Sequence, residues 1–379
     1  MPRLPADPPR LWPRFSSALH SAAVTARVGR VLGIAFGLCF VTGLLSHYQY
    51  EPWSWLPVPA APAWGYRLTQ GIHVTTGIAS IPLLLVKLWT VYPQLFAWPP
   101  VRSVVHAAER LSVFVLVAAS LTEVTIGFVN VLQWYPWHFG FVYVHRMLAY
   151  VVSGALLLHI AVKLPLIREG LGARVTAAPT AAPAVGLSRR GLLIATAAGV
   201  GTLVVTTVGQ SLGPLRRVAL LAPRRPTAGP QGLAVNRTAA EAGLRDIAAM
   251  TGWRMRVHGP RPFALDLAAF EALPAVDRSI PLACVEGWSA GADWRGPLLL
   301  DLVRRAGGDA DSRVRVVSLE RFGSYRASIV DGPQLARAVL ATHLNGERLD
   351  PDHGYPVRLI APDRAGVLNT KWLTAVEVL

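Results

Sequence analysis

The sequence carries Ile280-Pro-Leu-Ala-Cys-Val-Glu-Gly-Trp-Ser289 and, a few residues later, Trp294-Arg-Gly296. An apolar, strand-like run ends at Cys284, and the chain then turns through glycine and tryptophan. A thiolate in such a position can bind a soft or high-valent metal. The alternative on residue chemistry alone is a buried core cysteine, because cysteine also behaves as a small apolar side chain.

Two further blocks follow in the chain, His353-Gly-Tyr-Pro-Val-Arg358 and Lys371-Trp-Leu-Thr374. Together with the stretch around Cys284, they resemble the molybdopterin-binding domain of the sulfite oxidase family over roughly residues 231–379. The resemblance implies an α+β domain, an oxidoreductase activity and a molybdenum-molybdopterin cofactor.

The same resemblance implies roles for individual residues. Cys284 is expected to be the catalytic residue and to bind molybdenum as a thiolate. The phosphate and ring of the pterin need cationic and amide donors, and the positions that match family motifs are Asn236, Arg237, His353, Arg358 and Lys371. A solvated loop is an equally good interpretation of Asn236 and Arg237. Outside the matched motifs, surface or strand positions are expected for His258, Tyr325 and His343.

The residues after the cysteine bear on the substrate. Sulfite-oxidising members of the family carry Asn-Arg there, whereas this chain has Glu286-Gly-Trp288. This version is closer to the catalytic subunit of the bacterial periplasmic methionine sulfoxide reductase system. A carboxylate near the mouth of the site would repel an anion and tolerate a neutral sulfoxide or N-oxide, unless its side chain points away. The predicted substrate is therefore a small oxo donor or acceptor.

Long apolar segments dominate the first 213 residues. Only 16% of the 379 residues are charged, whereas a soluble domain carries about 25%. Five segments approach or exceed the roughly 20 apolar residues that cross a bilayer as a helix: Val28–His47, Leu68–Val91, Val104–Val131, Phe141–Leu166 and Gly191–Leu212. The predicted fold class is multi-domain, an all-α five-span transmembrane bundle followed by the α+β domain.

The charge pattern predicts an orientation. The net charge is +15, and the arginines gather at the ends of apolar runs, which indicates membrane lipid headgroups as partner and no nucleic acid. Basic residues crowd the N-terminal tail, and the opposite loops are rich in Trp and Tyr. The positive-inside rule then places the N-terminus in the cytoplasm of a bacterial multi-pass membrane protein. After five spans, the C-terminal domain lies on the extracytoplasmic side.

Arg189 and Arg190 open the fifth span after an Ala/Pro-rich spacer, residues 175–187. They resemble an internal twin-arginine export signal, and an ordinary positive-inside pair is the alternative. A domain that takes up a bulky cofactor in the cytoplasm must cross the membrane already folded, which favours the export signal.

Three histidines of the predicted spans are candidate ligands at membrane depth: His73, His145 and His159. Ionisable residues at membrane depth are candidates for function. Spans two and four run in the same direction, so His73 and His145 are expected at one depth, as bis-histidine ligation of a b-type haem requires. His159 lies about 21 Å further along its helix. It is a candidate ligand of a second haem, and its partner is undefined, because Lys87 occupies the equivalent position and His106 is shallow.

The four spans thus resemble a membrane cytochrome b that exchanges electrons with quinone or quinol. The alternatives are histidines that only hydrogen-bond between helices, a non-catalytic membrane cytochrome with a docking domain, and a transporter with a proton relay. The predicted organisation is a cytoplasmic tail (1–27), a four-helix cytochrome b-like domain (28–170), a linker with the twin-arginine motif (171–190), the fifth span (191–213), a second linker (214–232) and the molybdopterin-binding domain (233–379).

Within the last domain, β-rich runs predict strands at Trp253–Val257, Ile280–Cys284, Val314–Ser318, Tyr325–Ile329, Val357–Ile360 and Leu373–Val378. Helices are expected at Leu298–Arg305 and Pro333–Leu344.

Overall fold

The computed structural model describes residues 18–53, 55–173, 188–249 and 251–379. Arg3, Arg10 and Arg14 of the tail and the spacer at residues 175–187 lie outside these ranges. The chain divides into two compact units, each described separately below. One comprises residues 1–41 and 74–207, and the other comprises residues 42–73 and 208–379.

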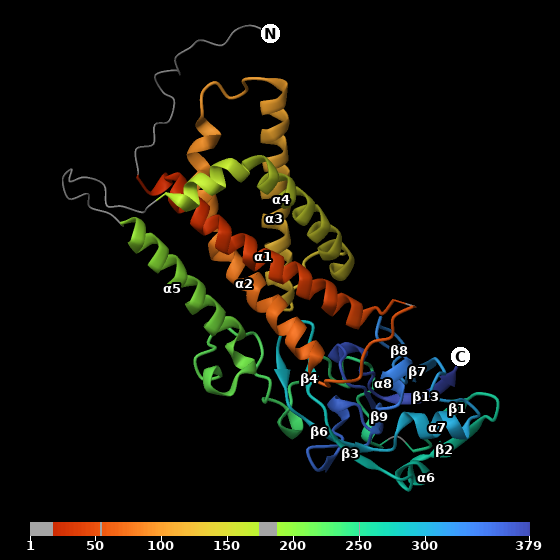
Figure 1. Cartoon of the computed structure of the whole chain (residues 1–379). Helices are drawn as coiled ribbons and strands as arrows, with labels where there is room; N and C mark the ends of the chain where they lie inside the picture. Colours follow the sequence, from red (N-terminus) through yellow and green to blue (C-terminus); the bar gives the residue numbers. More distant parts are fainter. Residues whose placement is uncertain (1–17, 54, 174–187, 250) are drawn as a thin grey trace. The chain divides into compact units, whose positions relative to one another are not determined.

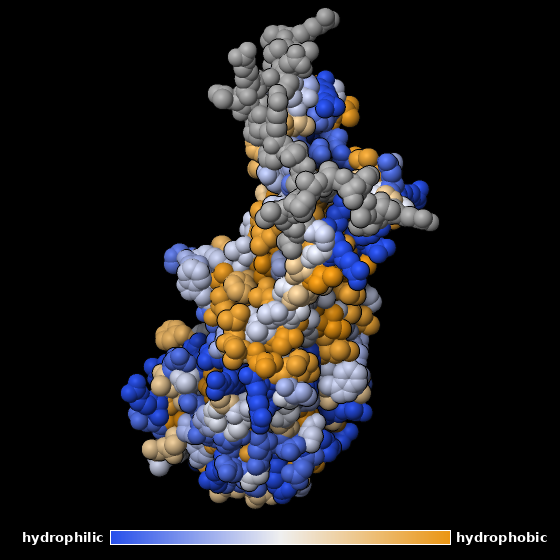
Figure 2. Space-filling model, turned by 90° about the vertical axis from the view of Figure 1, so that its left-hand side faces the viewer, coloured by the Kyte–Doolittle hydropathy of each residue, from blue (hydrophilic) through white to orange (hydrophobic). Residues whose placement is uncertain are grey.

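Five long helices occupy the N-terminal part of the described chain (Figure 1). They are α1 (Ala22–Tyr50), α2 (Gly65–Val91), α3 (Val104–Val131), α4 (Phe141–Gly172) and α5 (Arg189–Val208). Each is long and apolar enough to cross a membrane, which confirms the five predicted helical segments. Their large apolar side chains are widely exposed, for example Phe114 at 68% and Leu157 at 69%. Figure 2 shows apolar side chains gathered on this part of the molecule, as expected for a surface that faces lipid.

The first unit is held together by close helix packing. Leu32 and Ala35 of α1 pack with Leu83 and Leu84 of α2. Near the other end of α1, a Cβ at Gly170 of α4 would lie 2.7 Å from the backbone oxygen of Ala22. Only glycine permits this approach, which follows the use of small residues where helices pack closely in membranes.

The second unit is built on a five-stranded sheet in the order β2-β1-β13-β7-β8. Its strands are β1 (Arg254–His258), β2 (Phe263–Asp266), β7 (Val314–Ser318), β8 (Ala327–Val330) and β13 (Leu373–Val378). β1 and β13 are parallel, and the other neighbours are antiparallel.

Three smaller sheets complete the strands of this unit. A four-stranded sheet has the order β11-β10-β6-β3, and β12 pairs with β9 and β4 with β5. The bounds are β3 (Val276–Ser279), β4 (Leu282–Ala283), β5 (Ser289–Ala290), β6 (Asp293–Gly296), β9 (Val339–Ala341), β10 (His343–Leu344), β11 (Glu347–Arg348) and β12 (Arg358–Ile360). The short helices are α6 (Leu267–Glu271), α7 (Leu299–Arg305) and α8 (Gly332–Leu335). Single 3-10 turns lie at Ala18–His20, Tyr92–Phe96, Gly209–Ser211, Gly213–Leu215, Pro230–Gly232, Ile247–Ala249, Pro351–His353 and Gly366–Leu368.

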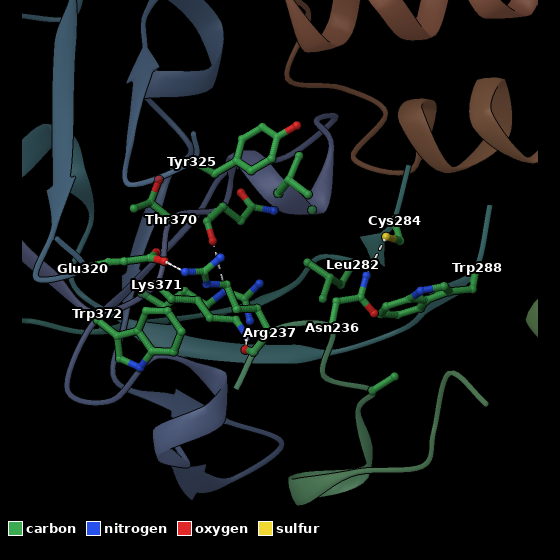
Figure 3. Close-up of a pocket in the computed structure, with 15 residues that line it drawn as sticks. Asn236, Arg237, Leu282, Cys284, Trp288, Glu320, Tyr325, Thr370, Lys371 and Trp372 are labelled. Carbon is green, nitrogen blue, oxygen red and sulfur yellow. Dashed lines mark hydrogen bonds and ion pairs between the residues drawn. The ribbon is translucent and has the colours of Figure 1, made fainter. Parts of the chain in front are cut away.

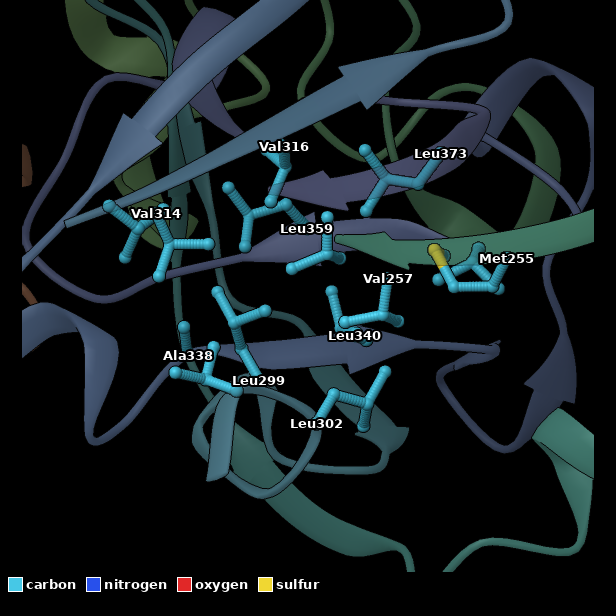
Figure 4. Packing of buried hydrophobic residues seen from close by; sticks show 14 of the residues in the cluster. Met255, Val257, Leu299, Leu302, Val314, Val316, Ala338, Leu340, Leu359 and Leu373 are labelled. Atoms are coloured by element: carbon cyan, nitrogen blue, oxygen red, sulfur yellow. The ribbon is translucent and has the colours of Figure 1, made fainter. Parts of the chain in front are cut away.

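The main core lies between α7 and the five-stranded sheet (Figure 4). Leu299 and Leu302 of α7 pack in one cluster with Met255 of β1, Val316 of β7 and Leu359 of β12. Each fully buried side chain of this size contributes about 1.5–3 kcal/mol to folding. Together they hold β12, which carries Arg358 at its first position.

The predicted helix Pro333–Leu344 is wrong beyond its first turn. α8 ends at Leu335, and the chain continues as β9 and β10. All three residues of β9 are buried, and β9 pairs with β12. Burial on every side favours an extended central strand over a one-faced helix, and tertiary pairing overrides the helical preference of the Ala- and Leu-rich sequence. Most other predicted elements occur within one or two residues of their predicted bounds; the run at 280–284 narrows to β4.

Residues 42–73, the end of α1 and the start of α2 with their connection, pack against the C-terminal fold in the second unit. Tyr66 is buried in one cluster with Ala283 and Ala365. The carboxylate of Asp363 accepts hydrogen bonds from Nε2 of Gln49 at 2.7 Å and from the backbone N–H of Tyr66 at 2.5 Å. This segment is therefore part of the same packed body as the strands that position Cys284.

Candidate active site

A tight hairpin holds Cys284. β4 and β5 pair directly, and between them the N–H of Gly287 donates to the carbonyl of Cys284 at 3.1 Å. The turn passes through Gly287 at φ +90°, a conformation that strongly favours glycine. The N–H of Cys284 donates to the carbonyl of Trp288 at 2.9 Å. The thiol is therefore fixed at the base of the turn and is 4% exposed.

The thiol lines a cavity that encloses about 700 Å³ of space not filled by atoms, part of it open to solvent. Figure 3 shows the side chains that surround it. The structure brings together here five of the six site residues predicted for the C-terminal domain: Asn236, Arg237, Cys284, Arg358 and Lys371.

Asn236 lies directly against the thiol. Its Nδ2 donates to Sγ of Cys284 at 3.0 Å and to the carboxylate of Glu286 at 3.1 Å. Its Oδ1 is buried and has no hydrogen-bond partner among the described residues. Asn236 thus offers an unpaired hydrogen-bond acceptor beside the thiol. It is therefore not part of a solvated loop, which was the alternative for Asn236 and Arg237.

Arg358 supplies a buried cation. Its Nε donates to the carbonyl of Asn369 at 3.2 Å, its Nη1 donates to the carbonyl of His353 at 3.3 Å, and its guanidinium lies over the ring of Trp294. Burial lowers the pKa of Arg358 to about 10. Within the described chain no carboxylate forms an ion pair with it, so a bound anion would compensate its charge.

Lys371 adds a second cation to the same wall. Its Nζ donates to the carbonyls of Arg237 and Asp352, at 2.9 and 2.6 Å. Burial, and then the Arg358 guanidinium, hold the pKa of Lys371 well below its usual range. At Gly354, with φ +109°, a Cβ would come within 3.0 Å of Cβ of Lys371, so glycine is required for the chain to pass here.

Arg237 closes the other side of the cavity, where it forms an ion pair with Glu320. The lining thus holds three cationic side chains and one carboxylate. This excess of positive charge suits an anionic ligand. A molybdenum-molybdopterin group fits these residues, because the buried thiol faces the cavity and the unpaired Asn236 Oδ1 and the uncompensated Arg358 guanidinium lie in its wall.

His353 does not line the cavity. It is fully buried behind Arg358, and its Nε2 lies 2.8 Å from the carbonyl of Pro230. Burial, and then repulsion by Arg358, lower the pKa of His353 to about 4. Its Nδ1 is buried without a hydrogen-bond partner in the part of the chain that the structure describes. His353 therefore supports Arg358 and does not reach the cavity itself.

The buried imidazole predicts a pH dependence of stability. The folded pKa of about 4 lies below the ordinary value of 6.5, so the folded state prefers neutral His353. The folded state is unaffected above pH 6.5 and loses up to about 3 kcal/mol as the pH falls from 6.5 toward 4. We expect His353→Gln to flatten this loss, measured by calorimetry of the full chain between pH 4.5 and 7.5.

A control variant and a contribution that is common to all the proteins isolate the effect of His353. His258→Gln changes an exposed imidazole of β1 and leaves the profile as in the wild type. The pKa of Asp363 is raised to about 6 by burial, and acidification through that range stabilises the folded state equally in all three proteins. Equal slopes for wild type and His353→Gln would contradict the assignment.

Glu286 does not lie near the mouth of the cavity, contrary to one of the two orientations that the sequence left open. It is buried, and its carboxylate accepts hydrogen bonds from Asn236 Nδ2 and from Nε1 of Trp288, at 3.1 Å each. Burial, and then this carboxylate, raise the pKa of the Cys284 thiol well above its usual range. Glu286 thus acts on Cys284 and not directly on an entering substrate.

The sequence missed several residues that line the cavity. Tyr325, expected at the surface or in a strand, lines it and accepts a hydrogen bond from the hydroxyl of Tyr50 at 3.0 Å. Glu320 and Trp288 also line it. Trp288 belongs to the block around Cys284, so its closeness to Cys284 in the sequence could have indicated that it lines the cavity. Glu320 lies in a loop after β7 and matches no motif, so no sequence signal pointed to it.

Two of the predicted haem ligands lie in different units. In the second unit, His73 of α2 is turned toward α1, where a Cβ at Gly43 would come within 2.9 Å of its Cε1 and Nδ1. In the first unit, Nδ1 of His145 lies 3.1 Å from Oε1 of the buried Glu123. A carboxylate on one ring nitrogen is the usual second contact of a metal-binding imidazole. The contact with Glu123 fits an imidazole of His145 that binds a metal through Nε2.

The surroundings of the remaining histidines give less support for a second haem. His106 lies at the start of α3, where its Nδ1 accepts a hydrogen bond from the N–H of Arg102 at 3.2 Å. Lys87 donates to the carbonyl of Thr25 at 3.0 Å. His106, the possible partner of His159, thus makes a local contact of its own, and Lys87, which occupies the equivalent position in α2, contacts α1.

The cavity suits a bound anionic cofactor, and comparison with known proteins indicates the class of domain. Residues 243–379 match the family model of the oxidoreductase molybdopterin binding domain. This match confirms, for that part of the chain, the resemblance seen in the three sequence blocks, and it supports a molybdopterin cofactor there.

Similar proteins include the uncharacterized oxidoreductase YuiH of Bacillus subtilis, 28% identical over 131 residues, which are 34% of this chain and 66% of that protein. Mitochondrial sulfite oxidase of Drosophila melanogaster is 36% identical over 107 residues, 24% of this chain and 18% of that protein. The putative protein-methionine-sulfoxide reductase subunit YedZ1 of Azospira oryzae is 32% identical over 116 residues, 30% of this chain and 44% of that protein. The chain thus spans just under two thirds of the first relative's length and less of the others.

Proposed function

We propose that this protein is a membrane-anchored molybdenum oxidoreductase that carries its own electron-transfer module. The observation that carries the proposal is a buried thiol, Cys284, on the wall of a cavity lined by Arg237, Arg358 and Lys371. When bound there, the molybdenum group supplies oxygen-atom transfer and accepts or donates two electrons. Cys284 holds the metal as a thiolate, and metal binding offsets the raised pKa of the thiol.

The residues of the cavity divide the remaining tasks. Arg358 and Lys371 bind the anionic part of the cofactor, and His353 keeps Arg358 in place through its backbone carbonyl. Asn236 contacts the thiol and offers its unpaired Oδ1 to the cofactor. Tyr325 lines the cavity, and its hydroxyl accepts a hydrogen bond from Tyr50.

The membrane helices support the second part of the proposal. His73 and His145 bind a b-type haem, and Glu123 orients the imidazole of His145. When bound there, the haem carries single electrons. A quinol in the bilayer supplies these electrons, or a quinone accepts them. The excess of basic residues at one end of the spans supports a cytoplasmic N-terminus, and Arg189 and Arg190 at the start of α5 support export of the folded domain.

The substrate is a sulfoxide or N-oxide type molecule, which is reduced. The resemblance of the residues after Cys284 to the methionine sulfoxide reductase type supports this, as does the similarity to a protein named as a putative protein-methionine-sulfoxide reductase subunit. The alternative is a sulfite-like dehydrogenase that feeds electrons to quinone. The similarity to sulfite oxidase supports that direction, and the burial of Glu286 removes one argument against an anionic substrate.

The test is a measurement on the detergent-solubilised protein. We expect one molybdenum per chain by elemental analysis and a b-type reduced-minus-oxidised spectrum. Sulfoxide should reoxidise the quinol-reduced haem, whereas sulfite should reduce the oxidised haem if the dehydrogenase alternative holds. Haem without molybdenum would indicate a cytochrome with a docking domain. The absence of both cofactors would favour the transporter alternative.

A further inference from the structure

A single hydrogen bond joins helix α2 to the peptide next to Cys284. Nε2 of Gln70 donates to the carbonyl oxygen of Val285, with 2.5 Å between the two atoms. Gln70 is only 7% exposed. Along the chain, Val285 directly follows Cys284, and Gln70 precedes His73 by three residues, which is about one helical turn.

Neighbouring contacts within the second unit hold this hydrogen bond in place. One turn before Gln70, the ring of Tyr66 packs with Ala283 and Ala365, and Ala283 directly precedes Cys284. The carboxylate of Asp363 binds the backbone N–H of Tyr66. The start of α2 is therefore anchored on both the residue before Cys284 and the residue after it.

We propose that Gln70 is the electronic bridge between the predicted haem ligand His73 and the predicted molybdenum ligand Cys284; this inference rests on the function proposed above. Electrons tunnel more readily along covalent bonds and hydrogen bonds than across van der Waals gaps. Such a path runs from His73 along one turn of α2 to Gln70, across the hydrogen bond to Val285, and along one peptide to Cys284.

The electron count is simple. Gln70 passes one electron at a time and gains or loses no bond and no proton. Two passages, each of which oxidises the haem by one electron and reduces the molybdenum centre by one, supply the two electrons that removal of one oxygen atom requires. The reductant is a quinol, and the final acceptor is the sulfoxide-type substrate.

A second glutamine, Gln49, allows a bridging role of Gln70 to be distinguished from a role in docking α2 alone. Gln49 of α1 is also 7% exposed, and its Nε2 donates to Oδ1 of Asp363 at 2.7 Å. It thus makes a buried side-chain hydrogen bond in the same unit, but its partner is not attached to the turn that holds Cys284. If Gln70 only helped to dock α2, the two glutamines would have comparable effects.

The experiment compares the full-length protein with Gln70→Leu and Gln49→Leu, each loaded with its cofactors and solubilised in detergent. The haem is reduced with duroquinol, methionine sulfoxide is added in a stopped-flow instrument, and reoxidation of the haem is followed at the Soret band. Haem and molybdenum contents and the midpoint potentials of both centres are measured first. Turnover is also measured with reduced methyl viologen, a small donor that reaches the molybdenum directly.

We expect Gln70→Leu to slow haem reoxidation about tenfold, because the path then has to cross a van der Waals gap; this equals the lower end of the losses of activity on changing groups around a metal ligand. Its cofactor contents, potentials and viologen-driven turnover should equal those of the wild type, and Gln49→Leu should match the wild type throughout. A wild-type rate in Gln70→Leu, an equal slowing in both variants, or a loss of molybdenum or viologen turnover in Gln70→Leu would each overturn the bridge. A wild type without haem or molybdenum would overturn the proposed function itself.

Discussion

Cys284→Ser abolishes oxygen-atom transfer and leaves the haem spectrum intact. The serine hydroxyl is a much poorer metal ligand than a thiolate. Among the described residues that line the cavity, Cys284 supplies the sulfur atom. We expect turnover to fall by more than about 100-fold, the upper end of what loss of even an outer-shell partner costs. The measurements are sulfoxide reduction with reduced methyl viologen and molybdenum content of the purified protein.

The chain provides a matched control for this variant. Cys39, the other cysteine of the sequence, lies within α1, and Cys39→Ser should retain both turnover and molybdenum. The circular dichroism spectrum checks that Cys284→Ser remains folded, since the serine is nearly isosteric and keeps the backbone hydrogen bonds of the turn. Full activity in Cys284→Ser would refute the molybdenum assignment.

His145→Ala and His73→Ala each remove the b-type haem while molybdenum stays bound. A bis-histidine site that loses one imidazole loses an axial ligand, and loss of His145 also leaves the buried Glu123 without its nearby imidazole. We expect the Soret band of the purified protein to fall to about one tenth or less of the wild type, in line with a 10–100-fold loss of metal affinity for disturbed sites. Viologen-driven turnover is expected to persist, because it does not require the haem.

Two further histidines complete this experiment. His106→Ala should keep the full haem content, because its ring contacts its own turn through the N–H of Arg102. His159→Ala distinguishes a protein with one haem from a protein with two. If His159 binds a second haem, the haem content per chain falls by half. An unchanged Soret band in both His73→Ala and His145→Ala would contradict haem binding by these spans.

Local patterns along the chain predicted much of the fold. The five apolar helices follow from length and composition, because a segment in lipid must satisfy its own backbone hydrogen bonds. Strands such as β7 and β13 follow from β-branched runs. The helix predicted over residues 333–344 failed because β9 is fully buried and pairs with β12, and such contacts do not appear in the local sequence.

The sequence alone indicated the class of cofactor, because the blocks around Cys284, Arg358 and Lys371 resemble those of the molybdopterin-binding domain. Only the tertiary structure decided how these residues act. It turned Glu286 toward Cys284 and away from the cavity, placed His353 behind Arg358, brought Tyr325 to the cavity, and joined Gln70 to Val285 across 215 positions of the chain. The physical reason is that burial, side-chain direction and long-range hydrogen bonds arise from packing between segments far apart in sequence, whereas residue chemistry and helix length are properties of the segment itself.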